Sequence, residues 1–204
     1  MSTNITDKNY KKLSLQVTLN GFSFCIIDTL NTKIVALTEI DFSDFPKSLK
    51  VEDYYWKAFN DYPELKEKYD EIIVLHDSNL DTFVPNALFD EEFLGSYLQY
   101  NTKVFETDFF AFDEIANCQM NTVYIPYVNI NNFFIDQFGT FDYKHATTIL
   151  VSKLLIGSKN NPEKKVVVHI NSGHFEIIVV QNQKLLFFNS FEYTTPEDFL
   201  YYIL

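Results

Sequence analysis

The sequence predicts an α/β protein whose two halves are related. Runs in which apolar and polar residues alternate, as strands do, are interleaved with amphipathic runs of helical period. In addition, two similar three-stranded patterns lie far apart in the chain, at 13–42 and 166–191. Strands that alternate with helices predict a layered α/β architecture.

The first predicted element is a β-hairpin at 13–28, in which two alternating runs meet at Asn20 and Gly21. This pair tolerates the positive φ angles of a type I′ turn. The elements predicted after it are a strand at 33–42, a helix at 51–69 with a break at Pro63, and a strand at 71–77.

The middle of the chain again mixes helices and strands. Gly139 and Gly157 each end an amphipathic helix, as glycine commonly does. The predicted elements are a helix at 86–100, strands at 103–112 and 122–127, and helices at 130–139 and 146–157.

The polar stretch 158–165 predicts a domain boundary. The predicted organisation is a tail at 1–12, a first domain at 13–157, a linker at 158–165 and the start of a second domain at 166–204. At the end of the chain, Thr194 or Thr195 is expected to cap a final helix that begins at Pro196. This helix has no C-cap, so we expect a truncated second domain, either because the chain is a shortened version or because another chain completes it.

Composition limits the possible partners. The net charge is −12, and all 16 basic residues are lysines. Without guanidinium groups and with this acidic balance, nucleic acid is not an expected partner. No apolar run approaches the roughly 20 residues of a membrane span and no signal sequence is seen, so the expected location is the cytoplasm. Cys25 and Cys118 are expected to be free thiols, because two cysteines make neither a disulfide framework nor a zinc site.

The two strand patterns align as an internal repeat with a shift of 153 residues. Residues 15–18 then lie on 168–171, and 24–27 lie on 177–180. A loop two residues shorter brings Lys33 onto Lys184. We interpret the repeat as a duplicated three-stranded meander; the alternative is that any two meanders can be slid into register.

With these residues in view, the chain resembles a known superfamily. Two meanders, the second reading VVVHINSGHFEIIVVQNQKLLFF, are similar to those of the actin-like ATPases, whose fold is ribonuclease-H-like. The similarity is greatest to the pilus-assembly and secretion-scaffold branch. Together with TPEDFLYYIL, the two meanders also resemble an uncharacterised bacterial family, a domain of unknown function to which that fold is assigned.

The resemblance implies a fold, while its own motif argues against the activity. In active members each hairpin tip holds an Asp-x-Gly pattern, whose Asp organises Mg²⁺ and whose Gly lets backbone N–H groups approach phosphate. In this chain the first pair falls on Gln16 and Thr18, and the second on His169 and Asn171. Neither glutamine nor histidine offers the carboxylate that Mg²⁺ prefers.

Strand alternation predicts which side chains share a face of each hairpin. Gln16 and Thr18 should lie with Ser23 and Cys25, opposite an apolar face. In the second hairpin His169, Asn171, His174 and Glu176 should lie together. The two histidines and the glutamate suggest a transition-metal or titrating site. A solvated hairpin end with no metal is the interpretation that we prefer.

Other candidate residues are isolated. Asp77 ends a strand, where α/β proteins often place a catalytic carboxylate, but an Asp that caps a loop is the preferred interpretation. His76 precedes it on the opposite face, so the two are not expected to act together. His145 is expected to be a surface or capping residue near the start of a helix.

Two functional hypotheses follow. In the first, the chain is a catalytically degenerate actin-like domain, a scaffold or interaction module that has a protein partner or self-associates and needs no cofactor. In the second, it is a divergent enzyme that binds ATP and Mg²⁺ or another small ligand, with His169 or His174 as acid or base. The substituted Asp and Gly positions, the absence of arginine and the low glycine content favour the first.

Overall fold

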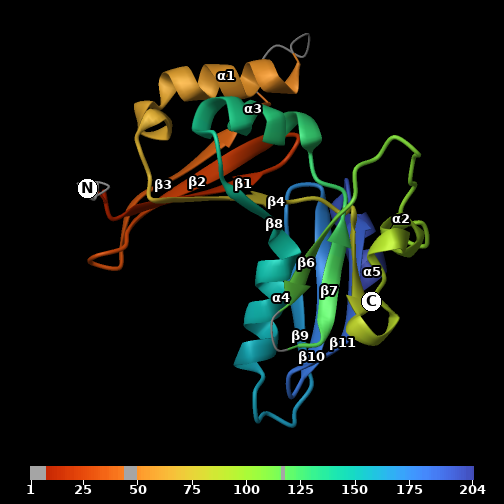
Figure 1. Cartoon of the computed structure of the whole chain (residues 1–204). Helices are drawn as coiled ribbons and strands as arrows, with labels where there is room; N and C mark the ends of the chain where they lie inside the picture. Colours follow the sequence, from red (N-terminus) through yellow and green to blue (C-terminus); the bar gives the residue numbers. More distant parts are fainter. Residues whose placement is uncertain (1–7, 44–49, 116–117) are drawn as a thin grey trace. The chain divides into compact units, whose positions relative to one another are not determined.

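The computed structural model describes residues 8–43, 50–115 and 118–204. It divides the chain into two compact units (Figure 1). Unit 1 contains Met1–Asp77 and Pro126–Lys144, and unit 2 contains Ser78–Ile125 and His145–Leu204. Each unit is therefore built from two separate segments of the chain.

Unit 1 is organised around a five-stranded sheet with the strand order β3-β2-β1-β4-β8. Strands β1, β2 and β3 form an antiparallel meander, and β1 also pairs in parallel with β4. Helices α1 and α3 lie together over one face of this sheet (Figure 1). The bounds are β1 Lys11–Val17, β2 Gly21–Asp28, β3 Lys33–Asp41, α1 Val51–Asp61, η1 Pro63–Lys66, β4 Glu71–His76, α3 Val128–Phe138 and β8 Asp142–His145.

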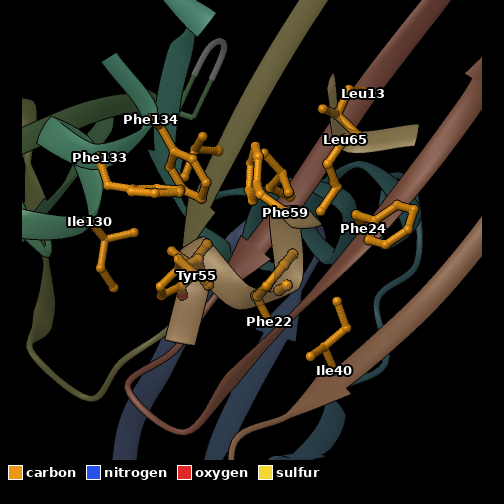
Figure 2. Packing of buried hydrophobic residues seen from close by; sticks show 14 of the residues in the cluster. Leu13, Phe22, Phe24, Ile40, Tyr55, Phe59, Leu65, Ile130, Phe133 and Phe134 are labelled. Carbon is orange, nitrogen blue, oxygen red and sulfur yellow. The ribbon is translucent and has the colours of Figure 1, made fainter. Parts of the chain in front are cut away.

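An aromatic core joins these helices to the sheet. Every second residue of β1 points into it, so that Leu13, Leu15 and Val17 are fully buried. Tyr55 of α1 stacks on Phe22 of β2, with ring centroids 5.0 Å apart. Further rings from α1 and α3 surround them (Figure 2). Burial of each such side chain contributes about 1.5–3 kcal/mol, so the core can hold unit 1 together.

Unit 2 contains two three-stranded sheets, ordered β5-β7-β6 and β11-β10-β9. Helix α4 packs against β6, β10 and β11, around a core that includes Ile115, Val151 and Ile178. On the other face of β10, Phe175 contacts the ring of Phe199 from α5, with centroids 4.7 Å apart. The bounds are β5 Asp81–Pro85, η2 Asn86–Leu88, η3 Glu91–Phe93, α2 Leu94–Leu98, β6 Ala111–Ile115, β7 Met120–Tyr124, α4 Ala146–Gly157, β9 Lys165–Ile170, β10 His174–Gln181, β11 Lys184–Glu192 and α5 Pro196–Ile203.

The two meanders have the same pairing pattern, which matches the 153-residue shift predicted from the sequence. Leu15 pairs with Phe24, and Val168 pairs with Ile177 at the equivalent place. The pairing between second and third strands shifts at Ile26/Ile27 in one meander and at Val179/Val180 in the other. Because the two meanders share even this irregularity, they are more alike than two unrelated meanders that are simply slid into register.

Several details differ from the sequence predictions. The first hairpin turns one residue earlier than predicted, since Thr18 and Gly21 form its closing pair and Leu19 and Asn20 lie between them. The predicted helix at 86–100 is split into η2, η3 and the short α2, with the Asp90 side chain accepting from the Glu92 N–H at the new start.

The third difference concerns the predicted strand at 103–112. The N–H of Phe105 donates to the Asp108 carboxylate, and the N–H of Asp108 donates to the Phe105 carbonyl. Because these two bonds close a turn, the strand begins only at Ala111. Strands β5 and β8 were not predicted. The final helix begins as predicted, with the Thr195 hydroxyl accepting from the N–H of Asp198.

The units also divide the chain differently from the predicted domains. Residues 158–165 lie inside unit 2, between α4 and β9, because α4 shares its core with β10. Within the described part of the chain, every helix falls short of the length and apolar character that a membrane crossing needs.

Candidate functional site at the hairpin tips

The tip of the second meander brings two histidines onto one carboxylate. His169 and Glu176 are paired residues of β9 and β10. The Nδ1 atom of His169 lies 2.9 Å from Oε2 of Glu176, and Nε2 of His174 lies 3.1 Å from Oε1 of the same side chain. The predicted shared face is thus confirmed, and each carboxylate oxygen faces one imidazole nitrogen.

Asn171 completes this group and the hairpin turn. Its amide nitrogen lies 3.2 Å from His174 Nε2, and its backbone N–H donates to the His174 carbonyl over 2.9 Å. The Tyr193 hydroxyl donates to the Asn171 carbonyl over 2.8 Å. Gly173 has a φ of 88°, a left-handed conformation that glycine adopts without strain. The tip is therefore fixed on both sides by hydrogen bonds.

Burial and charge set the ionisation of this group. The side chain of Glu176 is fully buried, whereas those of His174 and His169 are 13% and 38% exposed. Burial acts to raise the pKa of Glu176, but hydrogen bonds from His169 and His174 and their charges outweigh it and lower the pKa to about 2. A solvated hairpin end, the preferred sequence interpretation, is wrong for Glu176, because its side chain is fully buried.

The first meander has a polar tip of a different kind. The Gln16 amide donates to Oδ2 of Asp77 over 2.8 Å, and Asp77 is buried. The Thr18 hydroxyl donates to the Gly21 carbonyl over 2.9 Å. Ser23 pairs with Gln16 across the hairpin, as predicted for the shared face. Amide and hydroxyl groups at this tip are therefore used to close the turn and hold Asp77.

His76 is held apart from Asp77, as predicted. Its Nδ1 accepts a hydrogen bond from the Tyr127 backbone N–H over 3.2 Å, which places the proton on Nε2. That nitrogen lies 2.9 Å from Oδ1 of Asn131 and donates to it. Burial lowers the pKa of His76 to about 4, against an opposing contribution from Asn131. His76 is consequently a neutral, structural histidine of unit 1.

Unit 2 also contains a buried polar network that the sequence analysis missed. The Asp113 carboxylate accepts from the His145 backbone N–H over 2.8 Å and from the Thr148 hydroxyl over 2.7 Å. The Thr147 hydroxyl donates to Asp81 over 2.6 Å. Both carboxylates therefore lie at the amino end of α4, where the helix dipole favours negative charge.

His145 belongs to this network. Its ring accepts a hydrogen bond from the Thr147 N–H and so caps α4, which confirms one of the two predicted roles. The expectation of a surface position is wrong, because the side chain is fully buried and lies 5.1 Å, centroid to centroid, from the ring of Tyr124. One sequence signal was available for Asp113, since β6 alternates and places Asp113 on the same face as the buried Ile115.

Both cysteines are free, as expected. Cys118 is partly buried, and this burial raises the pKa of its thiol. A thiol of raised pKa is a weaker nucleophile near neutral pH, so Cys118 is a poor candidate for a reactive thiol.

Comparisons with known proteins agree with this fold. The model of the family described as "Protein of unknown function (DUF3822)" matches residues 1–204. A solved protein of Bacteroides thetaiotaomicron with an actin-like ATPase fold and unknown function superimposes with a TM-score of 0.85 at 22% identity, over 100% of this chain and 78% of that one. A chain of a PilM-PilN type IV pilus biogenesis complex gives a TM-score of 0.60 at 10% identity, over 89% and 61%. No curated protein matches the chain. The fold is thus that of the actin-like ATPases.

Proposed function

Because the chain belongs to the DUF3822 family and has an actin-like ATPase fold, we propose that it is a catalytically degenerate actin-like module that binds a protein partner. The observation that carries the proposal is the state of the two hairpin tips. The side chains that replace the Asp-x-Gly pairs are engaged in hydrogen bonds within their own unit.

The replaced positions lack the two properties that nucleotide chemistry needs. Gln16 presents its amide N–H to Asp77, and His169 presents Nδ1 to Glu176, so neither adds a carboxylate for Mg²⁺. Where glycine would let phosphate approach the backbone, Thr18 and Asn171 carry side chains, and their N–H groups donate to the Gly21 and His174 carbonyls. Donors that close a turn are not available to phosphate oxygens.

Exposed strand edges support a protein partner. Strand β3 is an outer strand of its sheet, and Ile34, Val35 and Leu37 on it are 58%, 57% and 70% exposed. Edge strands with apolar side chains are sites at which other chains pair. The similar pilus protein was solved in a complex named PilM-PilN. As part of the proposal, we extend protein binding to this chain, and the partner can be a second copy of the chain. We also propose the cytoplasm as the location of the protein.

Calorimetry with Mg²⁺-ATP tests the degenerate state. We expect no heat of binding at micromolar protein, because the hairpin donors and Mg²⁺ ligands are absent or engaged. Mg²⁺-ADP is the matched second ligand, since it presents fewer phosphates to the same tips. Micromolar affinity for either nucleotide would contradict the proposal.

The second candidate is a divergent enzyme, and the ionised Glu176 between two imidazoles is the observation that favours it. Such a group can transfer protons at a bound ligand. A nucleotide hydrolysis assay separates the two candidates: turnover that is present in the wild type and lost in His169→Ala would support the enzyme, and absence of turnover in both supports the module.

A further inference from the structure

Unit 2 has a surface hollow that is lined entirely by residues from the segment 91–110, which contains α2 and leads to β6. Its volume is about 750 Å³. Three phenylalanines line it, and Phe93, Phe105 and Phe109 are 54%, 53% and 54% exposed. Single exposed apolar residues are common on protein surfaces, whereas several that gather in one place mark a binding site.

The core of unit 2 holds the floor of the hollow in place. Leu94, Val104 and Phe110 line the hollow and also pack against a buried cluster that includes Leu98. An added Cβ at Gly95 would lie 3.0 Å from Cζ of Phe110, so the Phe110 ring packs directly on the backbone of α2. The apolar floor is therefore part of the fold, while the three half-exposed phenylalanines remain accessible to a partner.

Negative charge accompanies this apolar lining. Four acidic residues and one lysine line the hollow, and within the described part of the chain no ion pair neutralises any of the four carboxylates. The ammonium group of Lys103 lies 4.9 Å from the centroid of the Phe105 ring, so a cation is already placed on an aromatic face here. An occupant with positive charge beside apolar groups matches both properties. The acidic residues are Glu91, Glu92, Glu106 and Asp108.

These features favour a segment of a protein as the occupant. A small-molecule site typically encloses most of its ligand, whereas the rings of this hollow are half exposed. A second copy of the chain is disfavoured, because its net charge is −12 and it would meet negative charge. We propose that the hollow at 91–110 binds a segment of a protein partner in which apolar side chains are flanked by lysine or arginine. This inference rests on the proposed function, that the chain binds a protein, and names the chemistry of the partner.

Peptide display provides a direct test. The probe is a library of short random peptides selected against the full chain, and the enriched peptides are then synthesised with a fluorophore for polarisation measurements. We expect them to combine aromatic or aliphatic residues with lysine or arginine. Their affinity should fall as salt is added, because salt screens the attraction between exposed charges.

Two variants of the hollow and two matched controls locate the binding. Phe109→Ser removes a half-exposed ring and Glu106→Lys reverses a charge, and each should weaken binding by at least about 10-fold, as expected for an important interface contact. Ile156→Ser and Glu163→Lys make comparable changes at exposed positions of unit 2 outside the hollow. Both controls should bind like the wild type. Circular dichroism establishes that each variant is folded, so that lost binding reports on the hollow.

Three results of the selection would overturn the proposal: no peptide enriched over an uncoated surface, enrichment of acidic or uncharged peptides, or equal binding to Phe109→Ser and the wild type. Sedimentation velocity that shows a dimer, dissociated by Phe109→Ser, would identify a second copy as the occupant and would also overturn it. No nucleotide is present in the selection. Micromolar binding of Mg²⁺-ATP would therefore contradict the degenerate state of the hairpin tips while leaving peptide binding at the hollow intact.

Discussion

At the scale of single residues, the local environment gives the histidines of this chain different chemistry. His76 is buried against Asn131 and the Tyr127 backbone, so its neutral form is favoured. His169 and His174 instead each lie within hydrogen-bond distance of one oxygen of the buried Glu176 carboxylate. One residue type therefore serves the core of unit 1 and the candidate site of unit 2.

The neutral state of His76 predicts how stability depends on pH. Its pKa in the folded protein is about 4, below the ordinary value of 6.5. Between these values the unfolded chain binds more protons than the folded one, so stability rises with pH across this window and is lost as pH falls through it. The loss from neutral pH to pH 4 is about 3 kcal/mol for this residue.

Urea unfolding of the wild type and His76→Gln between pH 4 and pH 7 measures this contribution. Glutamine keeps an amide donor for Asn131 but does not titrate in this range. We expect the variant to be less stable at pH 7 and to show a smaller decrease toward pH 4. Parallel pH profiles for the two proteins would show that His76 is not the group responsible.

Candidate site residues could be predicted from the sequence where local geometry decides their place. Strand alternation was enough to bring His169, His174 and Glu176 together, because all three lie within one hairpin. It could not reveal that Asp81 and Asp113 meet the start of α4, since that meeting depends on contacts between segments far apart in the chain.

At the scale of elements, the two meanders reuse one backbone design with different side chains at the same positions. Gly21 and His174 are equivalent under the repeat. An added Cβ at Gly21 would lie 2.3 Å from the Ile40 carbonyl oxygen of β3. The first meander therefore packs its turn against the third strand too closely for any side chain, whereas the second accommodates a histidine.

Gly21→Ala should consequently destabilise the protein by at least about 1–3 kcal/mol, the cost typical of overpacking. Gly157→Ala is the matched control. Position 157 ends α4 and has open space around an added Cβ, and alanine favours helix, so this change should be neutral or slightly stabilising. Chemical denaturation of both variants gives the comparison, and equal stability of the two would refute the close-packing account.

Elements with strong periodicity were predictable, and short ones were not. The helix at 146–157 and the three strands of each meander lie within a residue or two of their predicted bounds, because their patterns are long and bounded by turn residues. The split of 86–100 depends on an Asp90 side-chain bond that periodicity does not show. Strands β5 and β8 are short and form through pairing with distant partners.

At the scale of the whole molecule, each unit combines two separate segments of the chain and has core residues of its own. Unit 1 has its aromatic core between the sheet and α1 with α3, and unit 2 has its own around α4. The sequence predicts a domain boundary at 158–165 because a polar composition is typical of loops. Loops inside a unit have the same composition, so sequence alone could not show that the segments 78–125 and 145–204 fold together.

Because the two units have separate cores, a substitution in one unit should lower the stability of mainly that unit. Asp113→Asn removes the charge from an acceptor of two buried hydrogen bonds at the start of α4, which should cost about 1.5–3 kcal/mol. Hydrogen exchange read by mass spectrometry should show faster exchange in α4 and β10, with little change in α1 and α3, because cooperative units open separately. The adjacent, exposed Glu114→Gln should alter neither set, since surface changes are usually within about 0.5 kcal/mol. Equal acceleration in α1 and α4 would mean instead that the two units open as one.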